Sequence, residues 1–127
     1  MNLRRAIASV GVAAAVVVSG AVVAAPANAT TKYGCKDTYL CAYRGSNYQD
    51  STGPGPVADN NQDLTMYPKF RYMKSIFNNG TQCTAYLFSQ TYYQGYKHTL
   101  SRGEGYPNLN NIPEFRTTGV QSNRWCK

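Results

Sequence analysis

One short stretch combines the residue types that acid–base catalysis requires. His98, Arg102 and Glu104 lie close together, and His98 is the single histidine of the 127-residue chain. An imidazole, a guanidinium group and a carboxylate that converge on a phosphate could form the site of a small ribonuclease. His98 and Arg102 would share one face of a strand, but Gly103 and Gly105 favour a turn that separates Glu104 from them. Because the sequence also has no G-x-S-x-G nucleophile turn, we predict that the protein is not an enzyme and that His98 is a surface residue of a strand.

Four cysteines offer a second kind of chemistry, the disulfide bond. Cys35, Cys41, Cys83 and Cys126 can pair in three ways. A bond from Cys83 to Cys126 would close a long loop and stabilise the fold by roughly 4 kcal/mol, whereas a bond from Cys35 to Cys41 would close a short loop and contribute less. We favour these two pairs, although the sequence does not exclude the others. A zinc site is the alternative, but the chain has no paired C-x-x-C motif and only one histidine; we predict no metal and no cofactor.

The N-terminal segment has the pattern of a secretory signal peptide. Two arginines precede an apolar run from residue 6 to 25, and Ala27-Asn28-Ala29 is an A-x-A cleavage site. The run is long enough for a membrane anchor, but its Ala, Gly and Ser content and the cleavage site favour removal of residues 1–29. We therefore predict a secreted, extracellular protein cleaved near Ala29, with residues 30–127 as a single domain.

The predicted mature chain is basic. The whole sequence carries a net charge of +7, and removal of Arg4 and Arg5 with the signal leaves about +5. A positive charge favours acidic partners, such as anionic cell-wall polymers or membrane surfaces. It can equally serve as a solubilising surface charge.

The rest of the chain has the residue pattern of a β-protein with frequent turns. No segment after Ala29 sustains apolar residues at helical spacing, and Gly, Pro, Asn and Tyr are scattered throughout. Residues 109–115 are expected to form a turn or a short helix.

The run 67–75, "YPKFRYMKS", could stack bases and pair phosphates. Its alternation favours instead a strand with Phe70 and Tyr72 inward and Lys69 and Arg71 outward, so we expect no nucleic-acid partner. The predicted strands are 39–44, 73–78, 83–89, 96–101 and 119–125.

An internal repeat gives the organisation of the domain. Tyr43-x4-Tyr48-x-Asp50 has the same aromatic spacing as Phe88-x4-Tyr93-x-Gly95, and each element follows a cysteine-bearing strand. Glycine tolerates the positive φ that a sharply folded hairpin needs, and two aromatic rings can pack across such a fold. Asp50 adopts this conformation less easily, so the first half should be less regular. Two similar halves, about 35–80 and 81–127, predict two Greek keys packed face to face. In this alignment Ser75-Ile76 of the first half corresponds to Gly119-Val120 of the second.

Several motifs together resemble a known family. These are "CKDTYLCAY" near the start, the two aromatic elements, "SIFNNGTQC" between the halves and the closing "GVQSNRWC". With them the chain resembles βγ-crystallin-type secreted proteins, and most closely the peptidase inhibitor family typified by Streptomyces metalloproteinase inhibitor. The resemblance implies an all-β sandwich of two Greek-key motifs, stabilised by disulfides. It also implies a monomer that inhibits a secreted peptidase, a metallopeptidase in particular, by loop insertion without catalysis. The alternative is a cationic antimicrobial or cell-surface-binding protein, akin to killer-toxin-like members of this fold.

Calcium binding is the other property that the resemblance raises. Many βγ-crystallin domains bind Ca²⁺ through an acidic or amide pair, then two residues, then Ser or Thr followed by Ser, which together supply hard oxygen ligands. In the first half this pattern falls on one apolar and two cationic residues before the serine. In the second half it retains one carboxylate and one hydroxyl. We therefore expect no strong calcium site. The positions concerned are Phe70, Arg71, Lys74 and Ser75 in the first half, and Glu114, Phe115, Thr118 and Gly119 in the second.

Two segments could insert into a peptidase cleft. One is 36–40, which a Cys35–Cys41 bond would close, and the other is the Gly/Pro-rich stretch 51–63. A rigid loop suits inhibition because its ordering entropy is lost before binding. The prototype inhibitor has a second short cysteine-closed loop in its latter half, which this sequence lacks. We therefore assign no inhibitory residue from the sequence.

Overall fold

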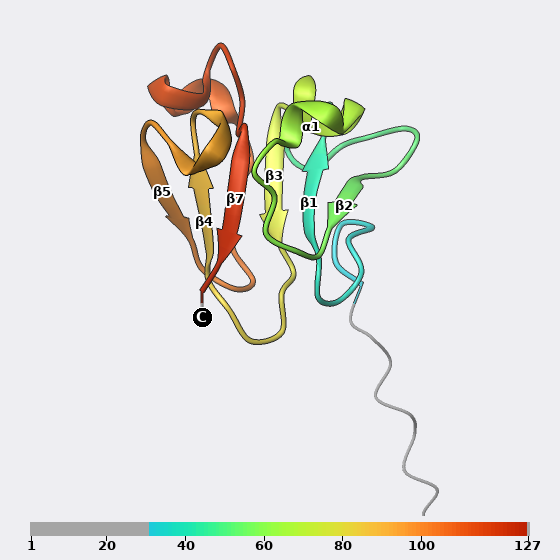
Figure 1. Cartoon of the computed structure of the whole chain (residues 1–127). Helices are drawn as coiled ribbons and strands as arrows, with labels where there is room; N and C mark the ends of the chain where they lie inside the picture. The colour runs from blue at the N-terminus through green and yellow to red at the C-terminus, as the bar shows by residue number, and fades with distance from the viewer. Residues whose placement is uncertain (1–30, 127) are drawn as a thin grey trace, which may run out of the picture.

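Two antiparallel sheets lie side by side in the computed structural model, which describes residues 31–126 (Figure 1). The predicted signal peptide, residues 1–29, falls outside the described residues. No helix within residues 31–126 is long and apolar enough to cross a membrane. The first sheet has the order β2-β1-β3-β6, and the second has the order β5-β4-β7. Their strands are β1 (Leu40–Tyr43), β2 (Gly55–Val57), β3 (Ser75–Asn78), β4 (Ala85–Phe88), β5 (Lys97–Leu100), β6 (Gly105–Tyr106) and β7 (Ser122–Trp125).

Each half of the chain contributes a segment to the sheet of the other half. Strand β6 belongs to the second half but pairs with β3 of the first sheet. In return, Asn61 of the first half forms a bridge with Asn123 of β7. This exchange is the arrangement of two interlocked Greek keys, as the sequence predicted. The predicted strands 39–44, 73–78, 83–89, 96–101 and 119–125 contain β1, β3, β4, β5 and β7, whereas β2 and β6 were missed because they are too short to show alternation.

Five short helical turns cap one end of the two sheets (Figure 1). In both halves a leucine turn is followed by a proline that starts the next turn, in the sequences LTMYPKFR and LNNIPEFR. Proline suits the first position of a helix because its φ is already fixed. The prediction of a strand at 67–75 is therefore wrong: Phe70 is buried, but Tyr72 is 64% exposed rather than inward. The turns are η1 (Leu64–Met66), α1 (Pro68–Arg71), η2 (Thr91–Tyr93), η3 (Leu109–Asn111) and η4 (Pro113–Phe115).

The core lies between the inner faces of the sheets and the helical turns. Alternate residues of the strands point inward, as the two-residue period of a strand requires, and Phe70 and Phe115 fill the capped end at equivalent positions of the two halves. Burial of these apolar side chains is the main force that holds the halves together. The cluster comprises Leu40, Ala42, Val57, Leu64, Phe70, Met73, Ile76, Ala85, Leu87, Leu100, Leu109, Phe115 and Val120.

Two buried serines hold the folded hairpins in place. The Ser75 hydroxyl donates to the carbonyl of Gly45 (2.6 Å) and accepts from the amide of Tyr48 (3.0 Å). The Ser122 hydroxyl donates to the carbonyl of Gln90 (2.6 Å) and accepts from the amide of Tyr93 (3.0 Å). Ser75 is therefore equivalent to Ser122, and the predicted match to Gly119 is wrong. The reason is that the segment between the helical turns and the last strand is longer in the second half.

The aromatic residues of the repeat pack as their spacing suggested. The ring centroids of Tyr43 and Tyr48 are 5.7 Å apart, and those of Phe88 and Tyr93 are also 5.7 Å apart. Gly95 has a φ of 77°, and a Cβ atom there would meet the Ser89 hydroxyl oxygen at 2.3 Å. Glycine is thus required at this position both by its backbone angle and by the close approach of Ser89.

Asp50 folds the first hairpin by a different means from Gly95. Its carboxylate accepts hydrogen bonds from the amides of Arg44 (3.0 Å) and Thr52 (3.1 Å) and from the ammonium group of Lys69 (2.6 Å). Burial alone would raise the pKa of Asp50, but these donors outweigh it and hold the pKa well below its usual range. Asp50 therefore uses its charge where the second half uses the small size of glycine.

The substitution Asp50→Asn should lower the free energy of unfolding by about 2 kcal/mol at pH 7, because it removes a charged acceptor from four donors, the three above and the hydroxyl of Thr52 (3.0 Å). The folded-state pKa lies below the unfolded value of about 3.9, so the contribution of Asp50 is complete above that value and is lost as the pH falls. Urea unfolding at pH 7 and pH 3 measures this: the difference between variant and wild type should shrink at pH 3. An equal difference at both pH values would contradict the assignment.

Tyr43 carries a buried polar atom that the fold does not satisfy. Within residues 31–126, its hydroxyl has no hydrogen-bond partner, and the equivalent residue of the second half is Phe88. Burial, followed by the nearby Tyr48 and Tyr33, raises the pKa of Tyr43 above its ordinary value. The substitution Tyr43→Phe should therefore leave the protein as stable as the wild type or raise its free energy of unfolding by about 1 kcal/mol. A thermal melt checks this, and a clear loss of stability would show that the hydroxyl has a partner.

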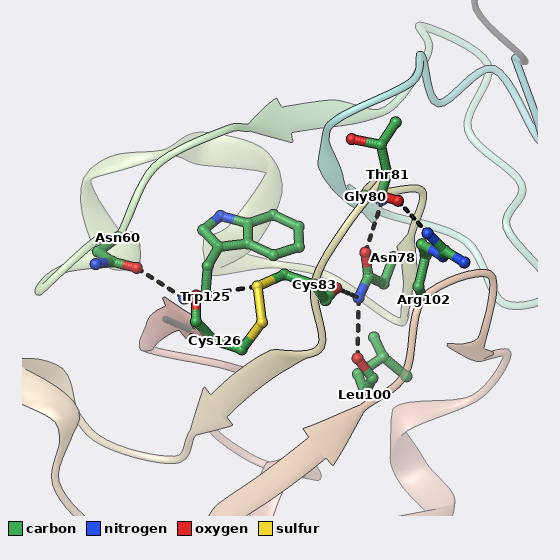
Figure 2. The surroundings of a disulfide bond; sticks show 9 residues. All are labelled: Asn60, Asn78, Gly80, Thr81, Cys83, Leu100, Arg102, Trp125 and Cys126. Atoms are coloured by element: carbon green, nitrogen blue, oxygen red, sulfur yellow. Dashed lines mark hydrogen bonds between the residues drawn. A yellow bond between two sulfur atoms is a disulfide. The ribbon is translucent and has the colours of Figure 1, made fainter.

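The two disulfides join Cys35 to Cys41 and Cys83 to Cys126, the pairs favoured from the sequence. Figure 2 shows the second bond beside the buried side chain of Asn78, which connects three segments. Its amide nitrogen donates to the carbonyls of Leu100 (2.9 Å) and Cys83 (3.2 Å), and its oxygen accepts from the amide of Gly80 (2.8 Å). This network fixes the connection between the halves next to the disulfide.

Candidate functional site

The residues considered for catalysis do not converge. His98 is only 26% exposed; its Nε2 lies 3.5 Å from Glu114 Oε2, and its ring packs 4.7 Å from that of Phe115. The side chain of Arg102 instead donates to the carbonyl of Thr81 (Figure 2). His98 thus lies on a strand and is partly exposed, because the helical turn at Phe115 covers part of that face of β5.

A surface hollow lies where the two halves meet. Its volume is about 720 Å³, and it is formed by a segment of the first half, residues 60–67, and by the tip of the folded hairpin of the second half. We call it the Tyr92 hollow. Its lining residues are Asn60, Asn61, Gln62, Asp63, Met66, Tyr67, Tyr92 and Tyr93.

Large apolar side chains are exposed in the Tyr92 hollow. Met66 is 75% exposed, Tyr92 63% and Tyr67 41%. Tyr96, just beyond the hairpin tip, is 65% exposed. A cluster of exposed apolar groups with a polar rim is typical of a protein-binding surface.

Several hydrogen bonds make the hollow rigid. Tyr92 and Tyr93 both have positive φ, 55° and 62°, which is strained for tyrosine. The amide of Tyr92 donates to the carbonyl of Gln62 (2.7 Å), and Tyr93 is held by Ser122 as described above. On the other side, Asn61 and Asn123 exchange two backbone hydrogen bonds of 2.9 and 3.0 Å. A surface fixed in this way loses little conformational entropy on binding.

The polar groups of the hollow are mostly engaged within it. The Asp63 carboxylate caps η1 by accepting from the amide of Thr65 (2.9 Å). Asn60 accepts from the amide of Trp125 (2.7 Å), and the hydroxyl of Tyr67 donates to the side chain of Asn61 (3.2 Å). The hollow therefore offers amide groups and rings for recognition, while its carboxylate is used to hold the backbone.

The internal repeat reveals how this surface differs from its counterpart. The amide of Asn47 donates to the carbonyl of Pro107 (2.7 Å) with a φ of 54°, which makes Asn47 the equivalent of Tyr92. Likewise Met66 and Asn111 end the equivalent turns η1 and η3. The Tyr92 hollow thus has Tyr and Met where the other half has two asparagines. Comparison of the two sequence repeats could have found Met66, because a methionine replaces a polar residue at an exposed position.

The two segments considered for inhibition differ in structure. The loop 36–40 is a tight turn with a φ of 77° at Thr38, whose amide donates to the carbonyl of Asn79 (2.9 Å). The stretch 51–63 is not one long loop, because it contains β2. Its exposed remainder, residues 58–63, runs along β7 and supplies one wall of the Tyr92 hollow.

Because Ser75 is equivalent to Ser122, the calcium pattern of the second half lies three residues later than the sequence suggested. Placed against Ser122 instead of Gly119, it falls on Thr117, Thr118, Gln121 and Ser122. These residues offer neutral oxygens only, and Ser122 already holds the hairpin. Within residues 31–126, no group of three or more His, Cys, Asp or Glu side chains is placed to hold a metal ion.

The fold places the protein among βγ-crystallin domains. It is similar to a solved structure described in connection with the evolution of the eye-lens βγ-crystallin domain fold, with 15% identity, a TM-score of 0.59 and coverage of 72% of this chain and 87% of that one. A βγ-crystallin from Ciona intestinalis has 14% identity, a TM-score of 0.54 and coverage of 69% and 99%. IPSE/alpha-1 from Schistosoma mansoni eggs has 18% identity, a TM-score of 0.57 and coverage of 72% and 87%. These likenesses establish the fold.

The sequence defines the family within this fold. Residues 28–100 match the sequence model of peptidase inhibitor family I36, and the chain belongs to this family. It is therefore a non-catalytic protein with a peptidase inhibitor role. All eight lining residues of the Tyr92 hollow lie within the matched region. A comparison with curated proteins finds no match.

Proposed function

We propose that the protein inhibits a secreted metallopeptidase and that the Tyr92 hollow is the surface that contacts the enzyme. The observation that carries the proposal is the exposure of Met66 and Tyr92 on a rigid frame, at positions where the other half has asparagines. Exposed aromatic and methionine side chains are enriched at protein interfaces. The metallopeptidase class rests on the resemblance to the metalloproteinase inhibitor family.

The proposed mode of inhibition is occupation of the peptidase cleft without hydrolysis. Residues 58–63 form an exposed segment whose backbone is held by Asn123 and by the cap of η1. Such a segment can enter a cleft without further ordering. The disulfide-closed loop 36–40 supports the fold in this proposal and does not contact the enzyme.

The signal-peptide pattern bears on where the protein acts. We infer that residues 1–29 are removed near Ala29 and that residues 30–127 act outside the cell as a monomer. We expect no calcium or other cofactor to take part. The calcium pattern of the first half holds Arg71 and Lys74, and that of the second half holds neutral residues only, of which Ser122 is engaged in the fold.

A titration against peptidases of different classes tests the proposal. Residues 30–127 are added to a thermolysin-like metallopeptidase, a serine peptidase and a cysteine peptidase, and the remaining activity is measured. We expect stoichiometric loss of metallopeptidase activity only. Loss of another class alone would reject the metallopeptidase assignment, and no loss in any class would reject the inhibitor proposal.

A further inference from the structure

The outer faces of the two sheets differ in a way that points to a second binding site. On the first sheet, the outer face is covered by the segment before β1. The ring of Tyr33 stacks on Tyr48 at 4.4 Å and meets Phe77 at 5.1 Å, and Cys35 is fully buried. The cluster under this segment comprises Cys35, Cys41, Tyr43 and Phe77, with Tyr39 and Tyr48 at its margin.

The equivalent face of the second sheet is open and basic. The residues equivalent to Cys41, Tyr43, Tyr48 and Phe77 are Tyr86, Phe88, Tyr93 and Arg124, as the alignment of the hairpins and of the two serines requires. Instead of a covering segment, this face has a hollow of about 490 Å³. We call it the cation face. It is lined by Tyr86, Phe88, Tyr93, Lys97, Arg124 and Trp125.

The two cations of this face are held by aromatic rings. The guanidinium carbon of Arg124 lies 4.4 Å from the ring centroid of Tyr93, and the ammonium group of Lys97 lies 5.1 Å from that of Tyr86. Both cations are exposed, and no acidic side chain lines the hollow. Lys97 pairs in register with Phe88 on one side of β4, and Arg124 pairs with Tyr86 on the other. Neighbouring strands are about 4.8 Å apart, so the cations stand on opposite sides of the hollow.

We propose that the cation face binds an acidic polysaccharide. Lys97 and Arg124 would pair with carboxylates at separate points of the chain, and the phenolic hydroxyls of Tyr86 and Tyr93 would bind sugar hydroxyls. Single-stranded nucleic acid fits less well, because base stacking needs free ring faces and the two cations already cover these rings. An acidic protein also fits less well, because no exposed apolar ring is left to serve as a central anchor.

This site overlaps the proposed peptidase surface at Tyr93 alone. Tyr93 lines both hollows, but Lys97 and Arg124 line only the cation face. The inference therefore does not depend on peptidase inhibition, and a glycan-bound inhibitor would be retained near an anionic cell surface. Variants at Lys97 and Arg124 should leave inhibition of a metallopeptidase unchanged.

Calorimetric titration with polygalacturonate, a polymer of uronic acids, tests the proposal. Wild-type residues 30–127 should bind polygalacturonate at low salt and should not bind dextran, a neutral glucan. The double variant Lys97→Gln/Arg124→Gln should bind polygalacturonate about tenfold more weakly, because it loses two exposed ion pairs. The matched control is Lys36→Gln/Arg44→Gln, which removes the same charge from exposed positions outside the cation face.

Three outcomes would overturn the proposal. Equal weakening in both double variants would show that overall charge, and no defined site, causes the binding. Tighter binding to single-stranded oligo(dT) or to phosphatidylglycerol vesicles than to polygalacturonate would assign the face to nucleic acid or to lipid. The absence of wild-type binding to polygalacturonate would reject the site.

Discussion

Replacement of Cys83 and Cys126 by alanine should lower the free energy of unfolding by about 4 kcal/mol, against about 2.4 kcal/mol for the pair Cys35 and Cys41. The two bonds span sequence separations of 43 and 6 residues. The longer loop restricts the unfolded chain more, so its bond contributes more to stability. In the native state Ala85 of β4 faces Trp125 of β7, so the Cys83–Cys126 bond fastens two strands that already pair.

Urea unfolding without reductant measures both effects on the two double variants. The Cys83→Ala/Cys126→Ala protein should have the lower midpoint. If the Cys35→Ala/Cys41→Ala protein were the less stable one, loop entropy could not be the main term, and contacts made by the segment over Tyr48 and Phe77 would have to dominate. Wild-type protein with intact disulfides is the control.

Replacement of Tyr92 by asparagine should weaken inhibition of the target metallopeptidase at least 30-fold. The exposed ring would be an anchor residue of the interface, and loss of such a residue costs about 2 kcal/mol or more. Asparagine is chosen because it occupies the equivalent position, Asn47, at nearly the same φ. It tolerates positive φ better than tyrosine does, so the hairpin should keep its fold. The variant Met66→Asn follows the same logic, since Asn111 is its counterpart.

The matched control is Tyr72→Asn. Tyr72 is 64% exposed, close to the 63% of Tyr92, but it does not line the hollow. We expect its inhibition constant to stay within about threefold of wild type, as is usual for residues outside a hot spot. Equal effects at Tyr72 and Tyr92 would mean that the contact surface lies elsewhere. Thermal melts of the three variants exclude unfolding as the cause.

The sequence predicted the fold because the repeat leaves clear signals. The pairs Tyr43–Tyr48 and Phe88–Tyr93 mark the folded hairpins, and Gly95 marks a backbone angle that only small residues adopt readily. The secondary structure was predicted wrongly at residues 67–75, where the spacing of apolar residues fits a strand although the chain forms a helical turn. Residues 67–75 alternate as a strand does, but Pro68 starts the helical turn α1 within them.

The candidate site was harder to predict because it is assembled across the two halves. Tyr92 meets Gln62, far away in the sequence, only because the chain crosses between the sheets. The missed equivalence of Ser75 and Ser122 had the same origin, since the second half is longer just before its last strand. A comparison of the repeats residue by residue, LTMYPKFR against LNNIPEFR, does identify Met66 as an exposed apolar residue without a counterpart.

The most direct test of the proposed contact surface is amide chemical-shift mapping of the ¹⁵N-labelled protein bound to the metallopeptidase that it inhibits. If the Tyr92 hollow contacts the enzyme, the largest shift changes and line broadening occur at residues 58–67 and 90–96, with small changes at residues 36–40. Changes concentrated at 36–40, with 58–67 and 90–96 unaffected, would contradict this proposal and would assign inhibition to the disulfide-closed loop.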